Sequence, residues 1–266
     1  MPVKDELGMR MKTFYEEIPK MKLMRRTPVI IRIDGKAFHT FTRGFQKPFD
    51  EVLTKTMQET TKYLCENIQG CVFGYTQSDE ISLVLVDYKK LNSSAWFDYE
   101  IQKMCSIAAS MATMKFNKIF EELVNEYDSL PQASGVRCNW YRTALNKGAM
   151  FDARCFNIPR EEVVNCIYWR QLDATRNSIQ MVGQANFSHK ELQGKTCNMI
   201  QDMLMEQKDI NWNDYPAYLK RGTAVIKEVY LAEDGEAIRT CWKIDLDMPQ
   251  LKGDDRWYLE RLIKYE

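Results

Sequence analysis

The stretch "VIIRIDGKAFHTF", residues 29–41, places a carboxylate at the end of a short apolar run. Residues 29–33 are mostly β-branched and are bounded by Pro28 and Gly35, a pattern that is typical of a buried strand. Asp34 therefore stands at the C-terminal end of the strand, and a glycine follows it directly.

A second stretch, "FGYTQSDEISLVLV", residues 73–86, has the reverse order. Two acids, Asp79 and Glu80, come immediately before its apolar run. We interpret this stretch and the residues just before it as two strands that are joined by the tight link "SDE".

The elements around these stretches predict an α+β fold. Apolar residues at helical spacing predict one helix over residues 49–67 and a long helix over residues 93–127, and "AMFDARCFNI" predicts a last strand over residues 149–158. The order βαββαβ is that of a ferredoxin-like polymerase palm. In such a unit the first and third strands are antiparallel neighbours, so Asp34 should lie beside Asp79 and Glu80.

The remainder of the chain predicts a mostly helical region with a β-hairpin. Ser188 and Glu191 fit a capping box, a helix follows over residues 197–207, and Asp234-Gly235 is a hairpin turn signal. We therefore divide the chain into a catalytic palm with an N-terminal extension, residues 1–158, and a helical and hairpin region that packs on it, residues 159–266.

Composition narrows the classes of function. The 37 basic and 37 acidic residues cancel, so any nucleic-acid contact must come from local patches. No apolar run approaches the roughly 20 residues that span a membrane, and the charged start does not resemble a signal peptide. The eight cysteines form no C-x-x-C pair, and there are only two histidines, which argues against a zinc site. We expect a cytoplasmic protein with free thiols and no membrane partner.

Converging carboxylates repel each other unless a proton or a divalent cation neutralises them. Mg²⁺ prefers oxygen ligands, and two such ions about 3.5–4 Å apart can promote phosphoryl transfer. The backbone carbonyl of Gly35 can approach a metal, and the N–H groups of "GKAFH" can cradle a triphosphate. Lys103, in the first turns of the long helix, is expected near the same edge. Taken alone, "DG" indicates a turn and "SDE" a hairpin tip; the pairing at matching strand ends is the specific signal.

Several motifs occur in an order that resembles a known family. The motifs are "RIDGKAFHTF", "KPFD", "YTQSDEISLVL", "WFDYEIQKMCSIAAS", "FDAR" and "YWRQLDATRNS". Together, over about residues 29–227, they resemble the tRNA-His guanylyltransferase family, including its guanylyltransferase-like members, the 3′–5′ polymerases. The resemblance implies a palm with two Mg²⁺ ions that adds nucleotides to the 5′ end of tRNA, with ATP and GTP as substrates, in a homotetramer.

The resemblance also implies roles for individual residues. Asp34 and Asp79 match the carboxylates that bind metal, Gly35 matches a ligand through its carbonyl, and Glu80 matches an essential acid beside them. Lys47 in "KPFD" matches a residue implicated in activating the tRNA 5′ end. The residues that match nucleotide-binding positions, besides Asp34, Gly35 and Asp79, are Lys36, Ala37, Phe38, His39, Ser78 and, for the triphosphate, Lys103.

One departure from the family pattern bears on specificity. Guanylyltransferases proper carry "HINN" after "WRQ-x-D", whereas this chain has Thr175 and Arg176 in place of His and Ile, and only Asn177 matches. This favours the guanylyltransferase-like members and the templated repair of 5′-truncated tRNA, with ATP or GTP activating the 5′ end.

Three alternatives stay open at the level of the sequence. The first is a tRNA-His guanylyltransferase proper. The second is a nucleotide cyclase, which sets two acids around two Mg²⁺ ions on the same palm. The third is a tRNA-binding protein without catalysis, and the intact acids Asp34, Asp79 and Glu80 argue against it.

Overall fold

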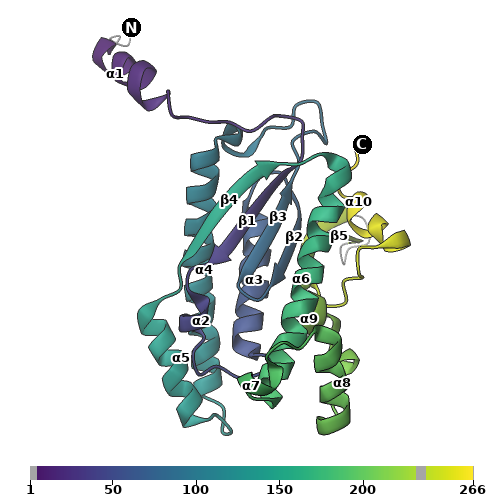
Figure 1. The fold of residues 1–266 in the computed structure, drawn as a ribbon. Helices are drawn as coiled ribbons and strands as arrows, with labels where there is room; N and C mark the ends of the chain where they lie inside the picture. The colour runs from purple at the N-terminus through teal and green to yellow at the C-terminus, as the bar shows by residue number, and fades with distance from the viewer. Residues whose placement is uncertain (1–4, 232–237, 266) are drawn as a thin grey trace.

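The computed structural model describes residues 5–231 and 238–265. Its centre is a six-stranded antiparallel sheet in the order β4-β1-β3-β2-β5-β6 (Figure 1). The strands are β1 (Val29–Gly35), β2 (Cys71–Gln77), β3 (Glu80–Leu85), β4 (Phe151–Asn157), β5 (Thr223–Leu231) and β6 (Ile238–Asp245). Within the described residues, we find no helix with the length and apolar content that crossing a membrane requires.

The first four strands have the connections predicted from the sequence. Helices α2 (Phe38–Phe41) and α3 (Glu51–Asn67) connect β1 to β2, and α4 (Ile101–Asp128) leads from β3 towards β4. The order β4-β1-β3-β2 places the first and third strands in the middle, which confirms the βαββαβ prediction. The structure adds α5 (Gly135–Lys147), which was not predicted, before β4. The helix predicted over residues 93–127 begins instead at Ile101, and a short 3₁₀ helix, η2 (Trp96–Tyr99), precedes it.

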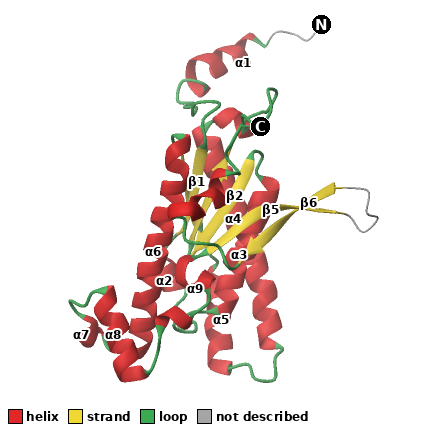
Figure 2. Cartoon of the chain, turned by 90° about the vertical axis from the view of Figure 1, so that its right-hand side faces the viewer, coloured by secondary structure: helices red, strands yellow, loops and turns green. Residues whose placement is uncertain are grey.

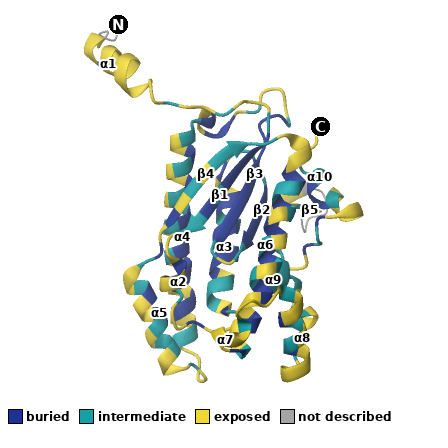
Figure 3. Cartoon of the chain, in the orientation of Figure 1, coloured by how far each residue is buried: buried dark blue, intermediate teal, exposed yellow. Residues whose placement is uncertain are grey.

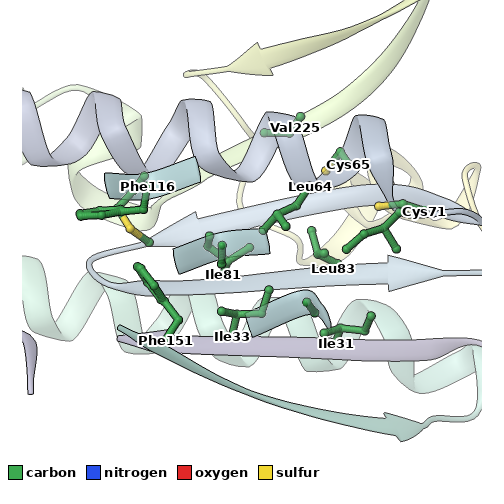
Figure 4. Close-up of a cluster of buried hydrophobic side chains, with 14 of the residues drawn as sticks. Ile31, Ile33, Leu64, Cys65, Cys71, Ile81, Leu83, Phe116, Phe151 and Val225 are labelled. Atoms are coloured by element: carbon green, nitrogen blue, oxygen red, sulfur yellow. The ribbon is translucent and has the colours of Figure 1, made fainter. Parts of the chain in front are cut away.

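Helices pack on each side of the sheet (Figure 2), so that both faces of the central strands are covered along most of their length. Ile31, Ile33 and Ile81 point towards α3 and α4, where they meet Leu64 and Phe116 (Figure 4). The alternate residues of the same strands pack on α6 (Arg160–Asn186). Because successive strand residues face opposite sides, two covered faces require the near-continuous apolar runs that the sequence shows.

The second half of the chain continues the same sheet. Strand β5 pairs with the edge of β2, with Phe73 opposite Ile226, and β6 pairs with β5. The predicted capping box of Ser188 and Glu191 is present at the start of α7 (His189–Leu192). The predicted turn at Asp234-Gly235 lies outside the described residues. The other helices here are α8 (Cys197–Lys208), α9 (Ala217–Arg221) and α10 (Trp257–Glu260), with short 3₁₀ turns at Trp212–Asp214 and Gly253–Arg256.

The N-terminal residues form an arm that projects from the body (Figure 1). Its helical part consists of α1 (Glu6–Met11) followed by one π-helical segment, η1 (Lys12–Glu16), and neither contains a buried residue. Figure 3 shows this helical part as exposed, in contrast to the central strands.

Candidate active site

The acids predicted to converge lie together at one end of β1 and β3. Asp34 is directly opposite Glu80 in the antiparallel register of these strands. Asp79 lies in the turn before β3, and its carbonyl accepts a hydrogen bond of 3.1 Å from the backbone N–H of Gly35. The predicted meeting of Asp34 with Asp79 and Glu80 is therefore confirmed, because the first and third strands are neighbours.

Asp79 is a partly buried carboxylate that forms no ion pair within the described residues. Burial raises the pKa of Asp79, and the negative charge of Asp34 raises it further. The hydroxyl of Ser78 donates a 3.1 Å hydrogen bond to Oδ1 of Asp79, which opposes this rise. The ionised form of Asp79 is thus not fully compensated by the chain itself.

Glu80, the residue after Asp79, differs from it in having ion-pair partners. Its Oε1 lies 2.7 Å from Nε of Arg170 on α6, and its Oε2 lies 3.9 Å from Nε of Arg32 on β1. Burial raises the pKa of Glu80, while Arg170 and Arg32 act in the opposite direction. Both Glu80 and Arg170 are buried, so their ion pair connects α6 to the sheet directly beside Asp34.

The three residues of the "WRQ" motif on α6 all make contacts that fix the helix, and Arg170 forms the ion pair with Glu80. The ring of Trp169 lies with its centroid 4.2 Å from the guanidinium of Arg170 and 5.7 Å from that of Arg32. Gln171 is buried and bonds through its amide to the carbonyl of Pro249 and the N–H of Leu251, both at 2.9 Å. The motif thus holds α6 against the sheet and against the C-terminal segment.

Two charged residues of β4 complete the surface around Asp34. In the register of β1 and β4, Asp152 is opposite Asp34 and Arg154 is opposite Arg32. Nη2 of Arg154 lies 3.1 Å from Asp152 and 3.7 Å from Asp34. Asp152 and Arg154 are not among the site residues predicted from the sequence. The alternation in "FDAR", which puts both side chains on one face of the strand, was the available signal.

A pocket of about 480 Å³ opens beside Asp79. Its walls come from β1, α2, the segment before α3 and the β2–β3 turn. Phe38 packs so closely on Gly35 that a Cβ at Gly35 would lie 2.3 Å from its ring, and Ala37 has a left-handed backbone with φ of 55°. The predicted site residues that line the pocket are Gly35, Ala37, Phe38, His39, Lys47, Ser78 and Asp79.

Asp34 and Glu80 lie on the sheet beside the pocket and do not line it, and two further predicted residues lie elsewhere. Lys36 does not line the pocket, and its backbone N–H donates a 2.8 Å hydrogen bond to the carbonyl of Met150. The expectation that Lys103 lies near the acids is wrong. The Lys103 ammonium lies 5.3 Å from the ring centroid of Phe97, close to the root of the N-terminal arm, where the N–H of Ile101 bonds to the carbonyl of Met21.

The direction of α4 explains the error over Lys103. Strand β3 begins at the acids, so the helix that follows it starts at the opposite end of the sheet. The part of α4 at the catalytic end is near Thr113, whose hydroxyl accepts a 3.2 Å hydrogen bond from the N–H of Phe151. Lys103 is ten residues earlier, about 15 Å along the helix axis.

The side chains of this site could bind a divalent metal ion only if a backbone carbonyl, water or substrate supplied further ligands. No group of three or more Asp, Glu, His or Cys in the described part of the chain is arranged to hold a metal ion. Asp34, Asp79 and the carbonyl of Gly35 offer three oxygen ligands. Mg²⁺ accepts such a partial set, because it keeps several waters and binds substrate phosphates. The uncompensated carboxylate of Asp79 is the observation that favours a cation here.

The segment that departs from the family pattern borders a second, smaller pocket. This pocket has a volume of about 100 Å³, and Ala174, Asn177 and Ser178 of α6 contribute to its wall. Arg176 does not reach it but forms an ion pair with Asp173 on the surface of α6.

Comparisons with known proteins match both the sequence and the fold of this chain. The family model described as tRNAHis guanylyltransferase matches residues 8–159. A bacterial tRNA(His) guanylyltransferase (Thg1)-like protein solved in complex with ATP is 42% identical, covers 98% of this chain and 100% of its own, and superposes with a TM-score of 0.82. A bacterial Thg1-like protein solved with GTP is 40% identical over 97% and 99% of the two chains, with a TM-score of 0.76. The tRNA(His) guanylyltransferase of Saccharomyces cerevisiae is 25% identical, over 75% of this chain and 82% of its own.

Proposed function

The chain belongs to the tRNAHis guanylyltransferase family, and on that premise we propose that it is a 3′–5′ nucleotidyltransferase that restores missing nucleotides at the 5′ end of tRNA. The observation that carries the proposal is the uncompensated carboxylate of Asp79, with Asp34 close to it, beside a pocket of about 480 Å³ lined by Lys47 and the loop after Asp34. The likeness to bacterial Thg1-like proteins solved with ATP and with GTP supports a nucleotide in that pocket.

In this proposal Asp34, Asp79 and the carbonyl of Gly35 would hold Mg²⁺. When bound, two such ions would neutralise phosphate charge and promote attack by a hydroxyl group. The residues of the chain position the reactants. The loop after Gly35 presents its backbone to the triphosphate, and Lys47 adds a cation at the pocket wall. Glu80, already paired with Arg170, keeps the end of β3 in place beside Asp34.

The reaction joins an incoming nucleotide to the 5′ end of the RNA. A 5′-monophosphate end first receives AMP or GMP from ATP or GTP, with release of pyrophosphate. The 3′-hydroxyl of the incoming nucleotide then attacks the 5′ phosphate in line, and the nucleoside monophosphate leaves. An end that already carries a triphosphate releases pyrophosphate instead. Positioning and charge neutralisation account for most of the catalysis in such transfers.

The residues of α6 at the "HINN" positions favour templated repair of several tRNAs over the addition of a nucleotide to tRNA-His alone. The "HINN" positions hold Thr175 and Arg176 here, and Arg176 is engaged with Asp173. A base-specific contact requires a free donor or acceptor that reaches a base edge, whereas an arginine suits phosphate as well as bases.

The deciding experiment offers each of the four labelled nucleoside triphosphates to tRNAs of several anticodons that lack their first 5′ nucleotide. We expect addition of the nucleotide that pairs with the base opposite, in several tRNA species. Addition of G regardless of the opposite base, or addition to tRNA-His alone, would identify a guanylyltransferase proper. A cyclic nucleotide formed without RNA would identify a cyclase.

A further inference from the structure

Two rows of like charge cross the sheet on the face beside α6. The acid row, in register across β4, β1 and β3, consists of Asp152, Asp34 and Glu80. The arginine row, two residues along the strands, consists of Arg154 and Arg32. Like charges directly opposite each other destabilise a sheet. Here the ion pairs between the rows offset that cost, at 3.7 Å from Arg154 to Asp34 and 3.9 Å from Arg32 to Glu80.

This face is open on the β4 side of α6. In Figure 1 no helix passes in front of β4 and β1, and the side chains agree: that of Arg154 is 49% exposed and that of Asp34 is 38% exposed. Trp169 on α6 is 53% exposed although it contacts both Arg170 and Arg32. A single exposed tryptophan is ordinary. This one is distinguished by its contact with two arginines that are themselves held to Glu80.

The nucleotide pocket lies on another side of the acids. Its walls come from the end of β1, α2, the segment before α3, Leu53 of α3, the β2–β3 turn and Met181 of α6, and they include neither Arg154 nor Arg32 nor Trp169. The proposed reaction brings two substrates to Asp34 and Asp79. If the triphosphate occupies the pocket, the exposed face at Asp34 and Arg154 offers the 5′ end of the RNA a separate approach to the acids.

We propose that the arginine row and Trp169 hold the 5′-terminal nucleotide of the RNA, with Arg154 binding its phosphate and the indole ring stacking on its base. The inference rests on the proposed function. A guanidinium binds phosphate through paired N–H groups, and the Cα of Arg154 is about 7 Å from that of Asp152, two residues along the strand, so that its guanidinium reaches 3.7 Å from Asp34. Stacking on an aromatic ring accepts every base, as templated repair of different tRNAs requires.

Equilibrium binding without nucleoside triphosphate tests the inference on the full chain. The probe is a fluorescent acceptor-stem RNA that lacks its first 5′ nucleotide and carries either a 5′-monophosphate or a 5′-hydroxyl. We expect wild type to prefer the phosphorylated probe and Arg154→Ala to lose that preference, with binding of the hydroxyl probe within twofold. Trp169→Ala should weaken both probes about 5- to 100-fold, and Trp169→Phe should retain most of the affinity.

The chain supplies matched controls. Trp257 is also 53% exposed and lies 4.7 Å from an arginine, Arg261, and Arg160 is exposed and paired with Glu161. Trp257→Ala and Arg160→Ala should bind both probes within twofold of wild type. Thermal melts identify any alanine variant that is not folded. Arg154→Gln, which keeps most of the side-chain volume, and Trp169→Leu then replace it with the same expected losses.

Three results would overturn the inference. The first is that wild type shows no preference for the 5′-phosphate probe, or that Arg154→Ala keeps the preference. The second is a Trp169→Ala variant that binds RNA like Trp257→Ala. The third is a loss of ATP affinity with RNA binding unchanged, which would assign Arg154 to the nucleotide. A wild type that binds the probe as expected but adds no nucleotide would contradict the proposed function and leave this inference standing.

Discussion

Two adjacent carboxylates in this chain have opposite environments. Glu80 points towards α6 and is paired with Arg170 at 2.7 Å, whereas Asp79 is desolvated, lies near Asp34 and has no cation partner among the described residues. Two neighbouring acids that differ in burial and in ion pairing usually have different roles. Asp79 is therefore the residue at which an added cation should have the largest effect, and Glu80 is the residue that holds the local structure.

Removing the charge of Asp79 should stabilise the metal-free protein. Burial raises the pKa of Asp79, so its ionised form at neutral pH costs free energy that a neutral side chain avoids. We expect Asp79→Asn to melt at a higher temperature than wild type in EDTA. Mg²⁺ at ten times its Kd should stabilise wild type by about 1.4 kcal/mol and the variant hardly at all. The exposed Asp254→Asn should respond like wild type; a full Mg²⁺ response in Asp79→Asn would exclude Asp79 as a ligand.

Gly35 is required by packing rather than by its backbone angles. A Cβ there would lie 2.3 Å from the ring of Phe38, so Gly35→Ala must displace α2 and the loop before it. We expect a loss of about 1–3 kcal/mol in the free energy of unfolding, which is usual for overpacking, together with weaker ATP binding. At Gly135 an added Cβ meets nothing within 4 Å. Gly135→Ala should therefore be neutral or stabilising, and equal effects at the two sites would contradict the packing argument.

At the scale of elements, α6 and α4 show how the direction of a helix decides which of its residues reach the site. Helix α6 runs along the sheet so that Arg170 meets Glu80 and Trp169 meets Arg32. Helix α4 starts at the far end, so its first turns, including Lys103, lie away from the acids. The surface that we propose for RNA binding therefore lies on the α6 face, at the end of the strands where the acids meet.

The buried ion pair between α6 and β3 should be costly to break on one side. Arg170→Ala leaves Glu80 buried with only the longer 3.9 Å contact to Arg32, so we expect a loss of about 3–5 kcal/mol in the free energy of unfolding. The double variant Glu80→Gln with Arg170→Met removes both charges and should be more stable than Arg170→Ala. Arg176→Ala, which removes an exposed ion pair with Asp173, should cost no more than about 1 kcal/mol. Urea unfolding measures all three, and a double variant no more stable than Arg170→Ala would show that the unpaired charge is not the cause.

Two lysines should behave differently towards ATP: Lys47, which the resemblance assigns to activation of the tRNA 5′ end, and Lys103, which it assigns to the triphosphate. Lys47 lines the pocket, and a hydrogen bond to a charged group is worth about 1.5–3 kcal/mol, so Lys47→Ala should weaken ATP binding about tenfold or more. Lys103→Ala should leave the ATP affinity within twofold, because its ammonium lies over Phe97 at the other end of α4. Calorimetric titration with ATP compares them, and a large loss in Lys103→Ala would mean that the triphosphate extends far beyond the pocket.

At the scale of the whole molecule, the N-terminal arm carries apolar side chains that contact no core. Phe14 is 61% exposed and Ile18 is 74% exposed. The root of the arm is fixed, since Arg25 pairs with buried Asp87 at 2.7 Å. Isolated helices as short as residues 6–16 are marginal in water, so the arm needs a surface to pack against. A second copy of the chain would supply one, in keeping with the tetramer that the family resemblance implies.

Light scattering during gel filtration tests this assembly. We expect wild type to have four times the 31.3 kDa mass of one chain. The assembly formed by the double variant Phe14→Ser with Ile18→Ser should have a smaller mass, because the two substitutions would remove apolar side chains that contact another copy of the chain. Leu91, which is 94% exposed in a loop, provides the control: Leu91→Ser should leave the mass unchanged. A wild-type monomer, or a double variant of unchanged mass, would contradict the assignment.

The sequence by itself determined the order of strands and helices and the meeting of Asp34 with Asp79 and Glu80. Hydrophobic periodicity is a local property, and the βαββαβ order leaves few ways to arrange four strands. Only the tertiary structure decided that Glu80 is paired and Asp79 is not, that Arg154 and Asp152 flank Asp34, and that Lys103 lies away from the site. These facts depend on which helix covers each face of the sheet and at which end that helix begins. The environment of a side chain is set by segments distant in sequence, and no pattern within its own segment contains that information.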